Sequence, residues 1–358
     1  MKRIVVIGGG IAGLSAAAEL AADADVTVLE AESSTGYHAS GRSAALIEQN
    51  YGAASVQALN RASVDYLSTH DGGYLSPRGL MIIARHEDAA AFADDIASMG
   101  LDRISTQDAC RMVPVLDPER VNLAGYHADA QDIDTDRLLQ GFARRLRQLG
   151  GEIVTNRRVS SVTRRTDGWT VRCGDDEYDA DILVNAAGAW ADTVARMAGV
   201  VPMGIVPHRR SMARIPAPGG QDVSHWPVFF GVRESWYAKP DAGALLVSPA
   251  DEDPVEPHDA WADDMTLAEG LALYQDMVTE PVTRMLSNWA GLRSFAPDRT
   301  LVLGPDPDEQ TFVWCAGQGG YGIQTSPAAS RLVADLVFGR PPGIDPASVA
   351  ALRPERLR

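Results

Sequence analysis

The sequence predicts an α/β fold in two parts: a Rossmann-like dinucleotide-binding domain and an α+β domain built on an antiparallel sheet. Two observations indicate the first part. A buried strand, a glycine-rich turn and a helix open the chain, and a strand, a second glycine cluster and a helix recur near its C-terminus. Polar–apolar alternation between residues 200 and 292 indicates the second part, because strands with one buried face show that pattern.

Composition excludes several classes of protein. The 358 residues include 32 Lys and Arg against 48 Asp and Glu, a net charge of −16 with neutral histidines. This length allows one large or two ordinary domains, and the charge disfavours a nucleic-acid-binding surface. Cys110, Cys173 and Cys315 are odd in number and lack CxxC spacing, which argues against a disulfide framework and a zinc site. We therefore expect neither nucleic acid nor a metal ion as a partner.

The first element is a βαβ unit. Residues 4–7 are all apolar and predict a buried parallel strand, and the turn at 8–13 leads into an Ala- and Leu-rich helix over 11–22. A second strand follows at 26–29 and ends at Glu30. After a loop over 33–45, helical periodicity returns at 53–69 and 87–99, and Thr106 is a candidate N-cap for a short helix.

An acidic segment at residues 131–136 has the look of a calcium loop. An EF-hand loop needs glycine at its sixth position and glutamate at its twelfth, where this chain has arginine and alanine. The segment instead predicts a helix over 136–149 with Thr135 or Asp134 as its cap.

Short strands and a second buried strand come next. Gly150 and Gly151 end the helix, and residues 182–185 are apolar and closed by a glycine at 188. The short strands are expected at 153–154, 159–164, 169–173 and from 178 onward.

The remaining elements belong to the alternating region and to the return of the first domain. Residues 241–243 predict a hairpin turn, and one helix is expected near 265–286. A strand at 311–316, the glycine cluster at 317–320 and a helix at 325–338 resemble the N-terminal arrangement.

The N-terminal motif predicts dinucleotide binding. Gly8 permits the tight turn, Gly10 lets the backbone approach a pyrophosphate, and Gly13 allows close helix–strand packing. The helix N-terminus offers free N–H groups to phosphates. Glu30, at the end of the second strand, has the carboxylate that would accept hydrogen bonds from ribose hydroxyls.

Two further glycine-bearing segments favour FAD over NAD. The strand that ends at residues 185–188 and the cluster at 317–320 each bring bare backbone close to the same nucleotide. Three such approaches spread over the whole chain suit a long, extended cofactor. Nothing indicates covalent attachment, and Cys315 lies in an apolar strand.

Nine segments, in order and nearly end to end, resemble the FAD-dependent D-amino-acid oxidase superfamily, and within it the bacterial D-arginine dehydrogenases. They are residues 6–13 (VIGGGIAG), 36–45 (GYHASGRSAA), 75–78 (LSPR), 132–136 (DIDTD), 184–190 (VNAAGAW), 209–211 (RRS), 237–243 (YAKPDAG), 289–295 (WAGLRSF) and 318–326 (QGGYGIQTS).

The resemblance implies a Rossmann-like FAD-binding domain and an antiparallel-sheet substrate domain with the active site between them. We assign residues 1–80, 140–200 and 294–358 to the FAD-binding domain and 81–139 and 201–293 to the substrate-binding domain. The implied chemistry is transfer of a hydride from an amino acid's α-carbon to flavin N5. The imino acid then hydrolyses to a 2-oxo acid and ammonia.

The resemblance also implies the residues that hold the substrate. Arg293 and Arg210 match the arginines that bind the substrate carboxylate, a task that suits a planar guanidinium, with Arg209 as the alternative to Arg210. Tyr237 and Tyr51 match tyrosines of the substrate pocket.

Gly320 matches the position whose carbonyl faces the substrate amine. The helix that follows it would point its N-terminus at the flavin and favour negative charge there. The expected FAD contacts are Gly8, Gly10, Ile11, Ala12, Gly13, Glu30, Ala31, Ser40, Arg42, Ser43, Ala44, Val159, Ala187, Gly188, Trp190, Gly319, Gly320, Tyr321, Gly322 and Ile323. Among them Ser40, Arg42, Ser43 and Ala44 would line the isoalloxazine and Val159 the adenine side, while Trp190 also suits plain core packing.

Two departures from the family pattern concern the substrate side chain. The D-arginine enzymes carry an acid where this chain has Leu80 and a histidine where it has Leu46. A guanidinium that faced Leu80 would lose its ion pair at a cost of several kcal/mol. We therefore expect a neutral, apolar D-amino acid, with recognition of a basic side chain by Glu48 as the alternative.

Other functions stay open at this stage. Oxidation of an N-methyl amino acid, glycine or another secondary amine would use the same arginines, and oxidation of a 2-hydroxy acid would normally want a base. A nucleotide-binding scaffold or tRNA-modifying domain is the alternative outside this chemistry, and the charge opposes tRNA. The electron acceptor could be a quinone, a dye or O2. We expect a cytoplasmic protein without a transmembrane segment, with peripheral association to the inner membrane as an alternative.

Overall fold

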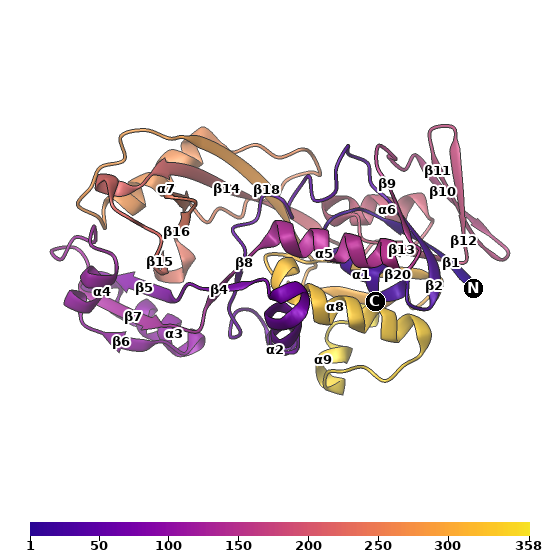
Figure 1. Cartoon of the computed structure of the whole chain (residues 1–358), viewed down its shortest axis with the longest axis horizontal. Coiled ribbons are helices and arrows are strands. Elements are labelled where there is room, and N and C mark those ends of the chain that lie inside the picture. Colours follow the sequence, from indigo (N-terminus) through magenta and orange to yellow (C-terminus); the bar gives the residue numbers. More distant parts are fainter.

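The computed structural model describes all 358 residues, and two large sheets lie toward opposite ends of its long axis (Figure 1). One sheet has six strands, and both ends of the chain lie near it. The other has eight strands and is built from the middle of the sequence. The predicted fold class, an α/β flavoprotein fold with a parallel and an antiparallel part, is confirmed.

The six-stranded sheet has the order β19-β20-β13-β1-β2-β9 and is parallel except for β19. Its strands are β1 (Lys2–Ile7), β2 (Ala24–Leu29), β9 (Glu152–Val154), β13 (Ile182–Asn185), β19 (Val302–Pro305) and β20 (Phe312–Ala316). Ile4 and Val6 of β1 face one hydrophobic core, and Val5 and Ile7 face another. Both faces of this sheet are therefore covered, which explains its nearly uninterrupted apolar strands.

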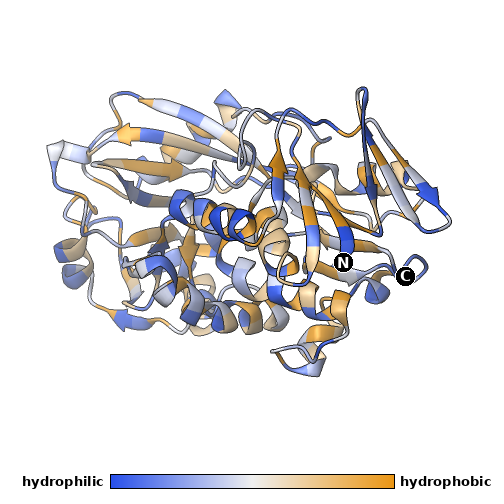
Figure 2. Ribbon diagram, turned by 45° about the vertical axis from the view of Figure 1, so that its right-hand side comes forward, coloured by the Kyte–Doolittle hydropathy of each residue, from blue (hydrophilic) through white to orange (hydrophobic).

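Helices pack mainly on the first of these faces. They are α1 (Ile11–Leu20), α2 (Ala54–Thr69), α5 (Thr135–Gln148), α8 (Gly322–Phe338) and the short α9 (Pro346–Ala350). The second face is covered by α6 (Ala191–Met197) and by a meander of β10 (Ser161–Arg165), β11 (Gly168–Cys173) and β12 (Asp176–Ala180). Hydrophobic residues gather on the interior strands, and hydrophilic ones on the outward faces of the helices (Figure 2).

The eight-stranded sheet has the order β18-β14-β17-β16-β15-β5-β7-β6. Its strands are β5 (Leu80–Ala84), β6 (Asp102–Ile104), β7 (Leu123–His127), β14 (Val206–Pro216), β15 (Val228–Gly231), β16 (Tyr237–Asp241), β17 (Ala244–Ser248) and β18 (Ser287–Phe295). All neighbours are antiparallel except β5 and β15. One face packs a core against α4 (Thr106–Met112) and α7 (Asp264–Gln275), and α3 (Ala89–Met99) covers part of the other.

A third, small sheet stands between the two large ones (Figure 1). It pairs β8 (Gln131–Ile133) with β3 (Leu46–Ile47) on one side and β4 (Leu75–Pro77) on the other. Three segments far apart in the sequence are thereby fixed side by side where the candidate site lies.

Most predicted elements appear within a few residues of their expected bounds, with three corrections. Ser105, not Thr106, caps α4, because its hydroxyl accepts the Asp108 N–H. The helix expected at 265–286 ends at Gln275. The helix expected at 325–338 begins at Gly322. Asp134 caps α5, which confirms one of the two caps that the sequence predicted. No helix is long and apolar enough to span a membrane.

A buried carboxylate fixes the entry from α6 into β14. Asp192 accepts backbone hydrogen bonds from Met203, Gly204 and Ile205 at 3.0–3.1 Å. Replacement by alanine would leave three N–H groups without their acceptor. We expect Asp192→Ala to lower the free energy of unfolding by about 3 kcal/mol, measured by urea denaturation. Asp175→Ala, at an exposed turn, should change it by less than about 0.5 kcal/mol; equal losses would contradict the assignment.

Candidate functional site

Strand register puts one row of side chains on the inner face of the eight-stranded sheet. Tyr237 of β16 lies opposite Phe230 of β15, which lies opposite Ile82 of β5. Directly opposed residues point to the same face, and so do residues two apart along a strand. Leu80 and Val228 therefore join this row, which faces the FAD-binding side of the molecule.

The same rule brings the two predicted arginines together. On β14 and β18, Arg210 lies opposite Gly291 and Arg293 lies opposite His208. The arginines are thus diagonal neighbours on one face. Gly291 presents no side chain there; a Cβ at this position would meet Ala39 and Arg42 at 3.6 and 3.7 Å.

A cavity of about 470 Å³ lies over this face. Its apolar wall includes Leu80, Ile82, Val228 and Phe230, and its polar rim includes Tyr51, Glu234, Tyr237 and Arg293. The segment from Ser43 to Glu48 and Gly320 close it from the other side. It brings together all of the predicted substrate residues except Arg210, which lines the adjoining hollow.

Two more hollows continue this cavity toward the parallel sheet. The middle one shares Ser43, Ala44, Tyr237, Arg293 and Gly320 with the substrate cavity. It shares Gly10, Ser40, Arg42 and Gly188 with the third, which reaches Gly8, Glu30 and Val159. The three form one connected channel from the ends of β1 and β2 to the inner face of the eight-stranded sheet.

This channel fits an extended dinucleotide. Gly188 has a φ of +54°, and a Cβ there would project into open space in the channel wall. The N-termini of α1 and α8 both open on the channel, and neither N-cap residue caps its helix with its own side chain. Bare backbone, helix N-termini and an elongated shape are the features that a pyrophosphate and its flanking rings require.

Most predicted FAD contacts line the channel, and four of them also contact other residues of the protein. Glu30 accepts the Gly9 and Glu32 N–H groups at 2.7 and 2.8 Å, and the Ser40 hydroxyl accepts the Ile11 N–H at 2.9 Å. Arg42 donates to the Ala260 and Ala290 carbonyls and pairs with Asp259, so its guanidinium ties loops together. Trp190 is half-buried beside His38 at the channel wall.

Two predicted contacts stand behind the channel. A Cβ at Gly13 would lie 1.8 Å from the Gly8 carbonyl oxygen, so Gly13 provides the close helix–strand packing that its motif predicts. The Tyr321 ring packs against Tyr51, with ring centroids 5.3 Å apart. Ala31 and Ala187 lie at the nucleotide end, and Ile11, Ala12, Gly319, Gly322 and Ile323 line the middle hollow.

The chain matches the family model described as FAD dependent oxidoreductase (DAO) over residues 3–336. It belongs to this family. It is therefore an FAD-dependent oxidoreductase.

Two curated relatives match this chain at low sequence identity. A Bos taurus protein, FAD-dependent oxidoreductase domain-containing protein 1, is 24% identical, with 94% of this chain and 81% of that protein covered. The L-2-hydroxyglutarate dehydrogenase of Escherichia coli (strain K12) is 28% identical, over 63% of this chain and 57% of that enzyme.

Two solved structures share the fold over nearly the whole chain. The L-proline dehydrogenase from P. horikoshii has a TM-score of 0.85 at 22% identity, with 99% of this chain and 97% of that one covered. The glycine oxidase from Geobacillus kaustophilus has a TM-score of 0.83 at 21% identity, with 98% of each chain covered.

The arginines of this family member sit in a cluster with two glutamates. Arg210 donates to Glu234 at 2.8 Å and to Glu252 at 3.1 Å, and its Nε has no partner. Arg293 approaches the same two carboxylates only to 3.8 and 3.9 Å and donates no hydrogen bond to the protein. Burial lowers the pKa of Arg293, but Tyr51 and Glu234 outweigh this and keep the group charged. Arg293 is therefore the arginine whose donors remain available to a ligand.

Gly320 leaves the space that Arg293 occupies. A Cβ at position 320 would lie 3.1 Å from the Arg293 Cζ and Nη1 atoms. The tyrosines flank the same group: Tyr51 donates to Glu234 at 3.1 Å, and Tyr237 lines both the cavity and the middle hollow. Burial raises the pKa of Tyr51, so its hydroxyl stays protonated.

The far end of the cavity holds the three predicted side-chain residues. Leu80 and Leu46 line it, and Glu48 is buried there. Glu48 accepts the Asn50 N–H at 2.9 Å and pairs with His127 at 3.0 Å. The hydrogen bond to Glu48 raises the pKa of His127. Both oxygens of Glu48 are thus engaged by the protein itself.

Sequence reasoning missed several residues of this site. Glu234 and Glu252 lie in loops with no motif around them. The wall formed by Ile82, Val228 and Phe230 could have been found, because each alternates with a core residue along its strand. No group of three or more His, Cys, Asp and Glu side chains is arranged to hold a metal ion.

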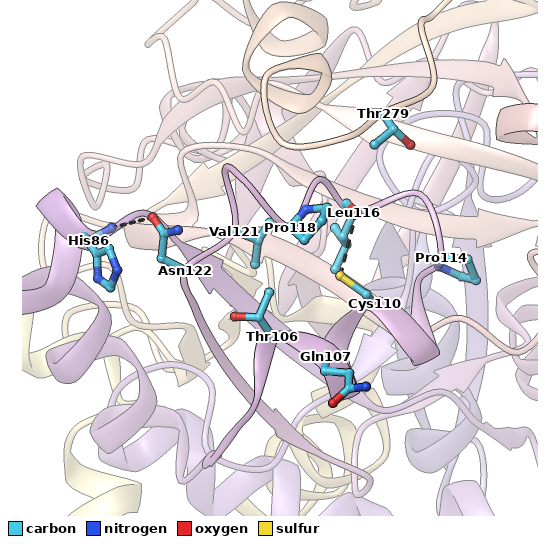
Figure 3. Close-up of a pocket in the computed structure, with 10 residues that line it drawn as sticks. All are labelled: His86, Thr106, Gln107, Cys110, Pro114, Leu116, Pro118, Val121, Asn122 and Thr279. Atoms are coloured by element: carbon cyan, nitrogen blue, oxygen red, sulfur yellow. Dashed lines mark hydrogen bonds between the residues drawn. The ribbon is translucent and has the colours of Figure 1, made fainter.

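A separate hollow, distant from the channel, lies beside α4 (Figure 3). Its ten lining residues include His86, Asn122 and Cys110 and no acid, lysine or arginine. The Cys110 thiol points at the Leu116 carbonyl, and burial raises its pKa. The hollow therefore lacks the charged groups and the reactive thiolate that a second site would need.

Replacement of Gly320 by alanine should displace Arg293 without closing the FAD channel. We expect Gly320→Ala to retain bound FAD, judged by its visible absorbance, and to raise KM for a carboxylate substrate about tenfold, which is about 1.4 kcal/mol. Gly343→Ala is the matched control, because nothing lies within 4 Å of a Cβ there. An unchanged KM in Gly320→Ala would contradict the role given to this glycine.

Proposed function

We propose that the chain oxidises a D-amino acid with a neutral, apolar side chain to the imino acid, which water converts to a 2-oxo acid and ammonia. The observation that carries this proposal is Arg293, a partly buried cation with free donors at the junction of an apolar cavity and the channel. A guanidinium so placed suits a carboxylate beside a hydrocarbon group.

The cavity wall supports an apolar side chain. Leu80, Ile82, Val228 and Phe230 offer hydrocarbon surface, and the nearest acid, Glu48, is engaged by His127 and Asn50. A cationic side chain against this wall would lose its hydration and would meet a Glu48 carboxylate that is already paired. This supports the expectation from Leu80 and weighs against recognition of a basic side chain by Glu48.

Two basic groups at or near the cavity are already paired, which favours an amine over an alcohol. FAD, when bound, accepts the two electrons and the hydrogen that leave the α-carbon. A neutral amine needs no base, whereas a hydroxyl must lose its proton. His127 is paired with Glu48, and Lys239 donates to the Ala44 and Ala45 carbonyls and pairs with Asp132. Neither is free to take a proton from a substrate hydroxyl.

A secondary amine is the second candidate, and it is supported by what the structural neighbours act on. They are an L-proline dehydrogenase and a glycine oxidase. The same Arg293 contact would serve sarcosine, glycine or proline, since each carries a carboxylate on the carbon that bears the nitrogen.

One titration separates these candidates. The yellow holoenzyme is mixed without oxygen with D-leucine, D-methionine, D-phenylalanine, D-arginine, L-leucine, sarcosine, L-proline and L-2-hydroxyglutarate, and bleaching of the flavin absorbance is followed. We expect the apolar D-amino acids to bleach it fastest and at the lowest concentration. Faster bleaching by D-arginine or sarcosine would overturn the substrate assignment. Admission of O2 afterwards shows whether the colour returns without another acceptor.

Leu80 gives a sharper test of side-chain selection. Leu80→Glu adds a carboxylate to the apolar wall, so kcat/KM for D-arginine relative to D-leucine should rise at least about tenfold, from an ion pair of 1–2 kcal/mol. Leu80→Met keeps the wall apolar and should leave the ratio within about threefold. A ratio unmoved by Leu80→Glu would show that the substrate side chain lies elsewhere.

A further inference from the structure

The loop between β15 and β16 carries a carboxylate into the arginine pair. Glu234, in the short helix η5 (Val232–Glu234), accepts from Arg210 at 2.8 Å and from Tyr51 at 3.1 Å and lies 3.8 Å from Arg293. Arg210 and Arg293 are the arginines predicted to bind the carboxylate of the substrate, and Tyr51 is a predicted residue of the substrate pocket. The protein's own glutamate thus has the contacts expected of the ligand.

The backbone of this loop is strained. Arg233 and Glu234 have φ values of +55° and +51°, which cost about 1–2 kcal/mol per non-glycine residue. The Arg233 N–H donates to Asp95 at 2.6 Å, and this is the loop's anchor on α3. The contacts of Glu234 therefore offset strain, and their loss would free the loop to change conformation.

Glu234 supplies one of the two negative charges that face the arginines, and the cluster as a whole keeps a net charge of +1. Arg210, Arg293 and Arg299 carry three positive charges, and Glu234 and Glu252 carry two negative ones. Burial alone would raise the pKa of Glu234, but Arg293 and Arg210 hold it below its usual range. A substrate carboxylate that joined the cluster would bring a third negative charge within a few ångströms of Glu234, where like charges repel.

The geometry points to Glu234 as an internal competitor: its carboxylate occupies the substrate's carboxylate position and leaves when substrate binds. This rests on the proposed function, since it assumes a substrate with a carboxylate. The exchange is one anion for another, so the net charge of the cluster is conserved. The Glu234 side chain is 30% exposed, against 7% for Arg210, so the glutamate is the mobile partner of the pair.

Isobutyrate and isobutyramide are suitable probes, because they share an apolar group and only the first is an anion. Their Kd values for FAD-loaded protein are measured by calorimetry in the wild type, Glu234→Gln and Glu252→Gln. Glu234→Gln should bind isobutyrate about tenfold more tightly, a change of about 1.4 kcal/mol, and isobutyramide unchanged. Glu252→Gln removes the same charge beside Arg210 and Arg293, but Glu252 does not line the cavity, so its effect should be smaller.

Each of the other outcomes would contradict one part of the proposal about Glu234. Weaker isobutyrate binding by Glu234→Gln would show that Glu234 positions the arginines, and equal binding would show that it stays in place beside the ligand. If both variants bound isobutyrate equally more tightly, the effect would come from the loss of a negative charge and not from the position of Glu234. If wild type and Glu234→Gln both fail to bind isobutyrate, while Arg293→Met still turns over substrate, the carboxylate site itself is wrong and the proposed function fails with it.

Discussion

The candidate site depends on the two-residue period of the eight-stranded sheet. Tyr237, Arg210 and Arg293 come from three strands, yet each has the parity that points it to the same face. A slip of one residue in any pair would send that side chain into the opposite core of Phe229 and Trp236. The apolar core on the outer face therefore fixes the chemistry on the inner one, because burial of the outer residues specifies the register.

A second constraint joins this sheet to the FAD side. Asp132 pairs with Arg78 at 2.7 Å and with Lys239 at 3.0 Å, and Lys239 also donates to the Ala44 and Ala45 carbonyls at 3.0 Å. These residues come from four of the segments that carry the family resemblance. Burial lowers the pKa of Lys239, and Asp132 counters this. The segments thus form a buried polar network that fixes residues 43–47 against the sheet. A network of this kind requires all its members.

The glycine pattern and strand periods predicted the fold and the cofactor, because both depend on local sequence, and the members of the cavity were predicted from the family resemblance. Helix limits were less certain: Gly322 is a poor helix former, yet α8 begins there. The helix expected at 265–286 stops at Gln275, where Met277 and Val278 turn into the core beside Leu116. The Glu234 contacts could not be predicted, because they join residues 24 and 183 positions apart. No local pattern shows which of 48 acids will meet which arginine.

The charge of the whole chain also bears on the substrate. A protein of −16 repels anions at long range, while the arginine cluster attracts them only within its cavity. A zwitterionic amino acid carries no net charge and approaches without this repulsion, whereas a dicarboxylate such as 2-hydroxyglutarate is repelled. Inside the cavity the Arg293 guanidinium lies close to the apolar wall that includes Leu80 and Phe230. Long-range repulsion and short-range complementarity therefore favour the same class of substrate.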